Sequence, residues 1–335
     1  MHKDKKKGKR DRLGIILIII AVCFYFKEVI FKGLLFWKDD IFDLWFPWYT
    51  YVFSYIKKGI FPLWNHLSLC GYPSFSFSRL GFFSPLNLIF LFLPVAYGLT
   101  IKTILSYILG AIFMYLYMRA LKVSWLSSIA ASLIFIFSGP FIEISFCPED
   151  FTFFYLPLIL FCIERAFEIS HRAAMYTLGA GLTLGIQCLT GHFQYVYFSV
   201  IFVTFYIFFR YGFKKDTIEQ IKILTMIFLI GIGVGAIQII PMCELLRLSF
   251  WRETGWSDFL TLEGLIRFVL PNFNPATLTH FPPDFPLWVG IVSVLLLFFA
   301  PKNKKIVRFY FYAFFISFVY KNQVTFFVAP KSFFS

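Results

Sequence analysis

Long apolar runs separated by short charged connections make up most of the chain after residue 12. A helix needs about 20 predominantly apolar residues to cross the hydrocarbon layer of a bilayer, and by that length the chain holds about nine spans. They lie near residues 13–31, 99–118, 125–142, 151–167, 173–190, 194–212, 221–241, 286–300 and 306–320. The pattern therefore predicts an all-α fold, a polytopic transmembrane helical bundle over residues 13–320.

Two connections, residues 32–83 and 242–285, are much longer than the others. Both are rich in aromatic residues, Pro and Gly, and neither offers an uninterrupted apolar span. This composition is typical of interfacial helices and tight turns, with Trp and Tyr at the depth of the lipid headgroups. The GIGVG run at residues 231–235 lies instead inside a span, where glycines favour close packing of helices.

The composition excludes an ordinary soluble domain. Apolar residues make up 59% of the chain and the mean hydropathy is +0.75, whereas soluble domains are about 45–50% apolar. The net charge of +13 suggests an acidic partner, but the basic residues mostly flank apolar runs. We therefore expect the lipid bilayer as a partner and no nucleic acid.

The distribution of Lys and Arg predicts the orientation. Residues 1–12 hold seven of them, and no cleavage site follows, so we expect a cytoplasmic N-terminus and a retained first span rather than a signal peptide. With that orientation the inner connections hold 19 Lys and Arg and the longer outer ones hold 8. The positive-inside rule agrees with this assignment and predicts a multi-pass protein of the cell membrane.

The first candidate for chemistry is KDDIFDLWFPW, residues 38–48, just past the first span. In a helical register Asp39 and Asp43 share a face, as do Asp40 and Asp43. Clustered carboxylates repel one another, which raises a pKa or recruits a divalent cation such as Mg²⁺ or Mn²⁺. These residues suit general-base catalysis or a phosphate clamped through a metal held by Asp40. The alternative is the solvated start of a loop.

Other polar residues fall at predicted outer ends of spans. His192 and Gln194 lie at a hairpin tip, where they contact a headgroup phosphate or simply cap the interface. Glu244 and Arg247 are spaced to form an ion pair beyond Pro241, and such a pair is either functional or structural. Glu149 and Asp150 add carboxylates to another outer connection. No Gly-rich phosphate loop appears, so nucleotide hydrolysis has no visible machinery.

Several short motifs occur in a fixed order between residues 30 and 295. They are Asp40 with Pro47, Pro62-Leu63-Trp64-Asn65, Gly71-Tyr72-Pro73, Pro85-Leu86-Asn87, Phe137-Ser138-Gly139, Gly191-His192 with Gln194, Gln238 with Pro241 and Glu244, and Leu270-Pro271. As an ordered set they resemble the bacterial YfhO family of membrane proteins. That family is similar to the C-fold glycosyltransferases, polytopic enzymes that use polyprenyl-phosphate sugars.

The resemblance implies a site in the first outer loop that faces a lipid-linked donor. Asp40 would be the base or metal ligand, with Asp43 or Asp39 as its partner. His192, Gln194 and Arg247 would lie near the phosphate, and Glu244, Glu149 and Asp150 are further substrate-binding candidates. The chain departs from the family at Leu44, where a polar residue is usual.

Family chains are also commonly longer, so residues 321–335 are predicted to be a truncated or frame-shifted end. The predicted function is transfer of a sugar from a polyprenyl-phosphate donor to an envelope polymer on the extracytoplasmic face. The alternatives are a transporter or flippase of lipid-linked intermediates, which would need polar residues at mid-bilayer and paired broken helices, and a non-catalytic scaffold.

Overall fold

The computed structural model describes residues 2–36, 41–67, 70–76, 78–138, 141, 150–212, 217–248 and 306. Regular structure within these residues is helical, and their one extended pairing is an isolated antiparallel bridge between Asn65 and Tyr72. The all-α prediction is confirmed for this part of the chain.

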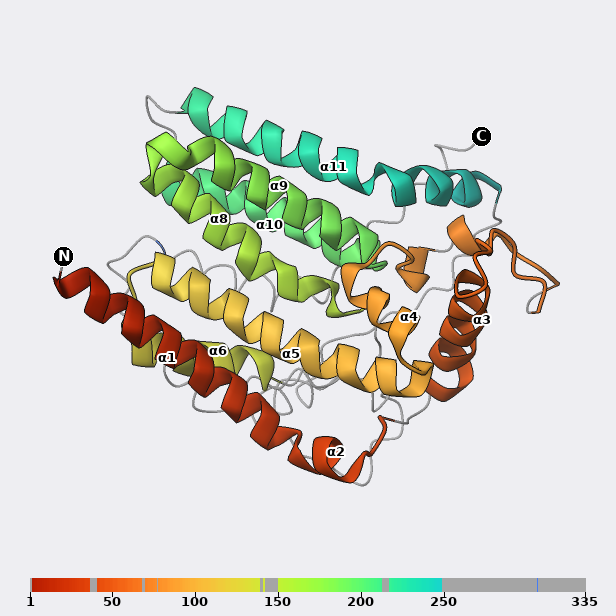
Figure 1. Cartoon of the computed structure of the whole chain (residues 1–335). Helices are drawn as coiled ribbons and strands as arrows, with labels where there is room; N and C mark the ends of the chain where they lie inside the picture. Colours follow the sequence, from red (N-terminus) through yellow and green to blue (C-terminus); the bar gives the residue numbers. More distant parts are fainter. Residues whose placement is uncertain are drawn as a thin grey trace, which may run out of the picture.

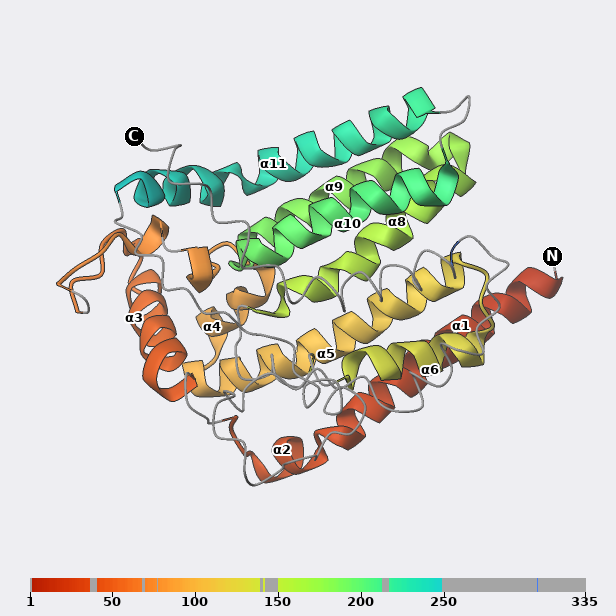
Figure 2. The same cartoon turned by 180° about the vertical axis from the view of Figure 1, so that it is seen from behind.

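The main helices run along a common axis and alternate in direction (Figures 1 and 2). They are α1 (His2–Tyr25), α5 (Val95–Ala120), α6 (Trp125–Ile136), α8 (Leu156–Glu168), α9 (Ala173–Leu189), α10 (Phe193–Tyr211) and α11 (Thr217–Leu248). Each of the first seven predicted spans overlaps one of them. The predicted spans 286–300 and 306–320 lie outside the described residues, apart from residue 306.

Within the described ranges, three helices are long and apolar enough to cross a membrane: α5, α10 and α11 up to Leu245. Others are shorter than predicted. α6 has 12 residues, and the predicted span 151–167 begins with a 3₁₀ segment, η5 (Asp150–Tyr155), followed by the 13 residues of α8. Pro157 lies in the first turn of α8, the position where its missing N–H is tolerated. At about 1.5 Å per residue, α6 and α8 are too short to cross the hydrocarbon layer alone.

The first span also differs from its prediction. α1 begins within the basic N-terminus and ends at Tyr25, and a separate short helix, α2 (Lys27–Lys32), follows it. Gly33 takes a left-handed conformation with φ of +63° and ends α2. A residue without a Cβ adopts that conformation at little cost.

The first long connection and the residues just after it form short elements at one end of the bundle. They are η1 (Ile41–Trp45), α3 (Phe46–Ile56), η2 (Ser74–Ser76), η3 (Ser78–Leu80), η4 (Pro85–Leu88) and α4 (Ile89–Phe92). α3 lies across the axis of the main helices in both views (Figures 1 and 2). The described residues of 32–83 do form short helices and turns, whereas their interfacial location stays a prediction. Residues 249–285 of the second connection lie outside the description.

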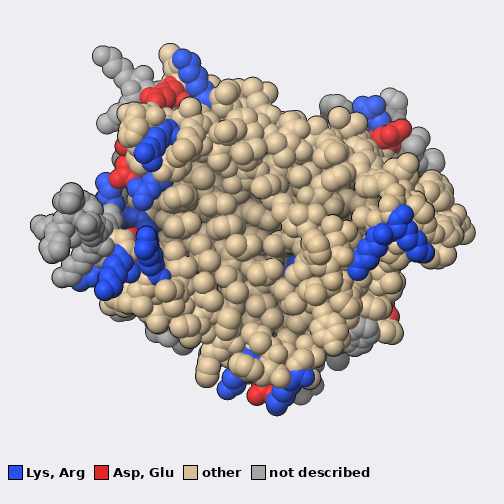
Figure 3. Space-filling view, viewed as in Figure 1, with Lys and Arg blue, Asp and Glu red and all other residues tan. Residues whose placement is uncertain are grey.

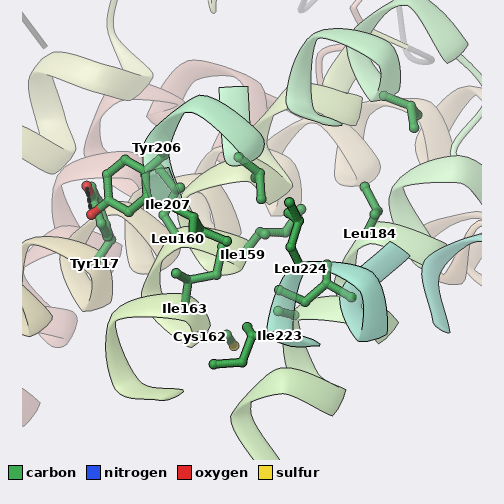
Figure 4. Close-up of a cluster of buried hydrophobic side chains, with 14 of the residues drawn as sticks. Tyr117, Ile159, Leu160, Cys162, Ile163, Leu184, Tyr206, Ile207, Ile223 and Leu224 are labelled. Atoms are coloured by element: carbon green, nitrogen blue, oxygen red, sulfur yellow. Dashed lines mark hydrogen bonds between the residues drawn. The ribbon is translucent and has the colours of Figure 1, made fainter. Parts of the chain in front are cut away.

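Buried side chains of the described residues form three clusters that hold these elements together. One joins α8, α9, α10 and α11 through residues such as Ile163, Leu184, Ile207 and Leu224 (Figure 4). A second joins α1, α5 and α6, and a third joins η1 and α3 to the start of α5. The end elements therefore share a core with the bundle.

The outer surface carries apolar stripes. On α1, Leu13, Ile16, Leu17, Ile20 and Phe24 are 40–68% exposed and follow helical spacing. On the face seen in Figure 3, charged side chains lie at the two ends and the lower edge, with a broad uncharged area between them. Exposed apolar surface of this extent favours a lipid environment.

Candidate functional site

The turn between α3 and η2 is fixed by its own hydrogen bonds. Asn65 and Tyr72 exchange backbone hydrogen bonds of 2.8 and 3.0 Å, and the Tyr51 hydroxyl donates to the Trp64 carbonyl at 2.7 Å. Gly71 has φ of +95°, and a Cβ there would lie 2.6 Å from Trp64 Nε1. Two of the ordered sequence motifs, 62–65 and 71–73, therefore form one closed turn.

The following residues contact the end of α9 and the C-terminal part of α11. A Cβ on Gly81 would lie 2.6 Å from the Thr190 carbonyl oxygen, and Gly81 has φ of +56°. Asn87 holds this turn, since its Nδ2 donates to the carbonyls of Leu80 and Gly81 at 3.1 and 2.7 Å. Gln238 of α11 donates to the Phe75 carbonyl at 3.1 Å. Three more motifs of the ordered set, those at Asn87, His192 and Gln238, thus meet at this end.

A buried polar cluster lies beneath this contact. Gln187 of α9 is fully buried and donates from Nε2 to the Thr152 carbonyl at 3.0 Å and to Ser199 Oγ at 2.8 Å. Thr190 and Thr152 are joined by a hydroxyl hydrogen bond of 2.8 Å. The cluster fixes η5 and the α9–α10 tip relative to each other, because buried polar groups are stable only when hydrogen-bonded.

Cationic side chains occupy the same end. The Arg79 guanidinium of η3 is exposed and lies 5.5 Å from the centroid of the Trp45 ring, within cation–π distance. Lys102 of α5 is 3% exposed, and its ammonium donates to the Tyr49 hydroxyl at 3.1 Å. The sequence analysis assigned no role to Arg79, although a lone basic residue among Phe, Ser and Gly of a predicted outer segment is a signal that could have found it.

His192 is the residue before α10, and its imidazole is half-buried. Burial, together with the nearby charge of Arg79, lowers the pKa of His192 to about 4. The imidazole is therefore neutral at physiological pH and can donate a hydrogen bond without adding charge. Gln194, two residues later, is exposed in the first turn of α10.

The predicted carboxylates are only partly within the described residues. Asp43 lies in η1 with its side chain exposed, two residues before Trp45. Asp39, Asp40 and Glu149 lie outside the described residues, and Asp150 is described only as the first residue of η5. That Asp43 shares a helix face with Asp39 and with Asp40 therefore stays a prediction.

The other predicted pair, Glu244 and Arg247, lies near the end of α11. Both side chains are exposed, and no ion pair joins them within the part of the chain that the structure describes. α11 continues through Pro241 as far as Leu248. The predicted pairing of these two residues therefore gives no support for a binding site.

The metal prediction rests on residues beyond the description. Among the described residues, no group of three or more His, Cys, Asp and Glu side chains is arranged to hold a metal ion. Asp40, the predicted ligand, lies outside that search, so a divalent cation at Asp40 stays a prediction.

What this end of the bundle offers is an exposed carboxylate, an exposed guanidinium and a neutral imidazole, presented by η1, η3 and the α9–α10 tip. Such a set can bind an anionic group and accept a proton from a hydroxyl. In comparisons with known proteins, no family model, no curated protein and no solved structure matches the chain.

Proposed function

We propose that the chain is a multi-pass protein of the cell membrane with its N-terminus in the cytoplasm. The alternating directions of α1, α5, α6, α8, α9, α10 and α11 support this orientation (Figure 1). They bring the basic N-terminus to the same end as the connections 121–124 and 169–172, and the segment 41–94 to the opposite end. The basic end then lies inside, as the positive-inside rule requires.

The function proposed for this membrane protein is transfer of a sugar from a polyprenyl-phosphate donor to an envelope polymer outside the cell. The observation that carries it is the folding of the first outer segment onto the bundle end, which presents Asp43 together with Arg79 and His192. A carboxylate at the same end of the bundle as cationic and neutral donors, at the expected depth of a lipid phosphate, suits this reaction.

The chemistry requires a base and an acceptor for the leaving charge. By the family resemblance the base is Asp40, with Asp43 or Asp39 beside it. The carboxylate takes the proton of the acceptor hydroxyl while the oxygen of that hydroxyl bonds to the anomeric carbon. The bond from that carbon to the phosphate oxygen breaks, and the lipid phosphate leaves with the electron pair. Mg²⁺ or Mn²⁺ at Asp40 would neutralise that charge when bound, and Gln194 and Arg247 are further candidates near the phosphate.

Transport of the same lipid-linked intermediates is the second candidate. Buried Lys102, Gln187 and Gln238 inside helices favour it, because polar groups within a membrane often mark a pathway. Transporter sites are commonly built from paired broken helices. α9, α10 and α11 are each continuous through their described lengths, which favours the transferase.

The test is sugar transfer from a polyprenyl-phosphate donor to isolated envelope polymer by membranes that carry Asp40→Ala or Asp43→Ala. Loss of the general base is expected to reduce transfer by about 100-fold or more at Asp40. Glu28→Gln is the matched control, since Glu28 lies in α2 in an exposed ion pair with Lys32 and should leave transfer unchanged. Undiminished transfer by the Asp40→Ala protein at equal expression would remove the proposal.

A further inference from the structure

Residues 9–12 of α1, the cationic turn, carry Lys9, Arg10 and Arg12 directly before the exposed apolar stripe of the same helix. These three side chains are exposed, and among the described side chains none of the three has an acidic partner. Lys9 lies four residues before the exposed Leu13, and therefore on the same side of the helix. Arg12 has the same relation to the exposed Ile16. A surface that suits lipid tails thus ends in a group of positive charges.

Contacts on the opposite side of α1 fix the direction in which these cations point. Asp11 accepts hydrogen bonds from the Tyr115 hydroxyl at 3.0 Å and from Arg119 Nε at 2.8 Å, both on α5. A Cβ on Gly14 would lie 2.7 Å from the same Tyr115 hydroxyl oxygen, so the two helices are in close contact there. Because Asp11 is paired with Arg119, it does not neutralise the three cations. Rotation of α1 about its axis would break these contacts, so the cations stay on the outward side.

The position of the cationic turn suits the headgroup layer of a membrane. Lys and Arg lay their apolar stems along an apolar surface and keep their charged ends in the polar layer beyond it. Figure 3 shows several Lys and Arg side chains gathered at the end of the molecule where α1 begins in Figure 1. An anionic headgroup at that depth is attracted by each nearby Lys or Arg, which contributes about fivefold in affinity.

We infer that the cationic turn of α1 binds the headgroup of an anionic phospholipid, whose acyl chain lies along the apolar stripe. A zwitterionic headgroup has no net charge and gains little from the three cations. An acidic soluble protein would pair with the charges but would leave the stripe uncovered, so the stripe favours a lipid. The inference does not depend on sugar transfer, and it adds to the predicted orientation a lipid bound at a defined place on the protein.

The test counts the lipids bound to the purified full chain in detergent by native mass spectrometry. The probes are dioleoyl phosphatidylglycerol, which is anionic, and dioleoyl phosphatidylcholine, which has the same chains and no net charge. The wild-type chain is expected to bind its first phosphatidylglycerol about tenfold or more tightly than its first phosphatidylcholine. Equal affinity for the two lipids would overturn the inference. Tighter binding of a short polyglutamate than of phosphatidylglycerol would also overturn it, because it would assign the cationic turn to an acidic protein.

Replacing the three cations together, by Lys9→Gln, Arg10→Gln and Arg12→Gln, should weaken binding of the first phosphatidylglycerol about tenfold or more and leave phosphatidylcholine binding unchanged. Arg12→Gln alone covers the case in which the triple variant does not fold, and it should weaken binding about fivefold. Wild-type affinity in the triple variant, or in Arg12→Gln where the triple variant does not fold, contradicts the inference. Arg10→Lys combined with Arg12→Lys keeps all three charges and should bind like wild type, and a loss there would contradict attraction by charge.

The matched control removes three exposed cations elsewhere in the chain, by Lys27→Gln, Lys57→Gln and Lys58→Gln. Lys27 lies just past the far end of α1, and the other two follow α3. The change in net charge is the same as in the triple variant of the cationic turn, and unchanged affinity for the first phosphatidylglycerol is expected. An equal loss in this control would show attraction by net charge alone and would overturn the inference.

Discussion

Glu164 and Arg210 face each other between α8 and α10. The carboxylate accepts hydrogen bonds from Arg210 Nε and Nη2 at 3.0 and 3.2 Å and from the Tyr206 hydroxyl at 2.6 Å. Tyr206 accepts in turn from the Tyr117 hydroxyl at 3.0 Å, which brings in α5 (Figure 4). Three helices are therefore joined through one carboxylate that is only 7% exposed.

Glu164→Gln should destabilise the protein markedly, because it leaves the Arg210 charge without its counter-ion. Breaking a buried pair costs about 3–5 kcal/mol, and since the Arg210 side chain is 30% exposed we expect about 2–3 kcal/mol here. The measurement is the apparent Tm in detergent. Glu168→Gln, one turn later in a more exposed ion pair with Arg165, should cost less than about 1 kcal/mol. Equal losses in the two variants would contradict the prediction.

His192 should make stability depend on pH. Its pKa is lowered to about 4 in the folded protein from an ordinary value of 6.5, chiefly by burial and then by Arg79. The unfolded chain then binds more protons than the folded one between these values, so stability falls as the pH is lowered from about 6.5 towards 4. His192→Gln should lose less stability than wild type between pH 7.5 and 5, as read from the apparent Tm. Parallel pH profiles for the two proteins would show that His192 carries no such dependence.

At the scale of elements, α9 and α11 pack through glycines spaced four residues apart on each helix. A Cβ on Gly185 would lie 2.5 Å from Val234 Cβ, and one on Gly181 would lie 2.7 Å from Ile230 Cβ. In return, a Cβ on Gly231 would lie 2.7 Å from Leu184 Cδ2, and one on Gly235 2.8 Å from Cys188 Cβ. The prediction that residues 231–235 serve close helix packing is confirmed. Small residues at this spacing let helix backbones approach closely. Such packing stabilises helix association in a bilayer, where lipid provides no hydrophobic driving force between helices.

Gly185→Ala should separate the two helices and cost about 1–3 kcal/mol, the usual effect of overpacking. Gly233 is the internal control, because it lies on the same helix as Gly231 and a Cβ added there would meet no atom of the described residues within 4 Å. Gly233→Ala should be neutral or stabilise by up to about 1 kcal/mol through helix propensity. The measurement is the apparent Tm of each variant in detergent. An unchanged apparent Tm for Gly185→Ala would contradict the prediction, because it would show that the interface adjusts to the added methyl group.

The boundaries of the elements were predicted unevenly. α5, α10 and α11 follow their predicted spans because a continuous apolar run determines them. α8 begins later than predicted and α1 earlier, since the pattern of apolar residues does not distinguish a 3₁₀ segment from an α-helix or show how far a basic segment continues a helix. Ser124 marks the start of α6 through a hydrogen bond from Ser127 N of 3.2 Å, a cap that the sequence alone allows one to read.

The whole molecule has two chemically different ends. At the end that holds the basic N-terminus, Arg119 pairs with Asp11 at 2.8 Å and Lys122 with Glu168 at 3.3 Å. At the other end lie Asp43, Arg79 and His192. Because α1 and α11 expose apolar stripes between these ends, the bundle axis is expected to cross the bilayer.

This orientation predicts opposite labelling of two single-cysteine variants in a background without native cysteine. Asp43→Cys, at an exposed position, should react with a membrane-impermeant maleimide added to intact cells. Lys122→Cys, at the basic end where the native side chain is 80% exposed, should react only after the cells are opened. Labelling of the Asp43 position solely from inside would remove both the orientation and the function built on it.

The amino-acid sequence by itself determined the class of the fold, the positions of the main helices and the motifs of the end opposite the basic N-terminus. The physical reason is that lipid as a solvent demands long apolar runs, and tight turns demand Gly, Pro and Asn at fixed places. Only the tertiary structure placed Arg79 on Trp45 and near His192. Arg79 and His192 are more than a hundred positions apart in the sequence, so no local pattern could predict that they approach each other. It also decided that Gln187 and Gln238 bind other segments, since a buried amide is satisfied by whichever partner the packing brings near.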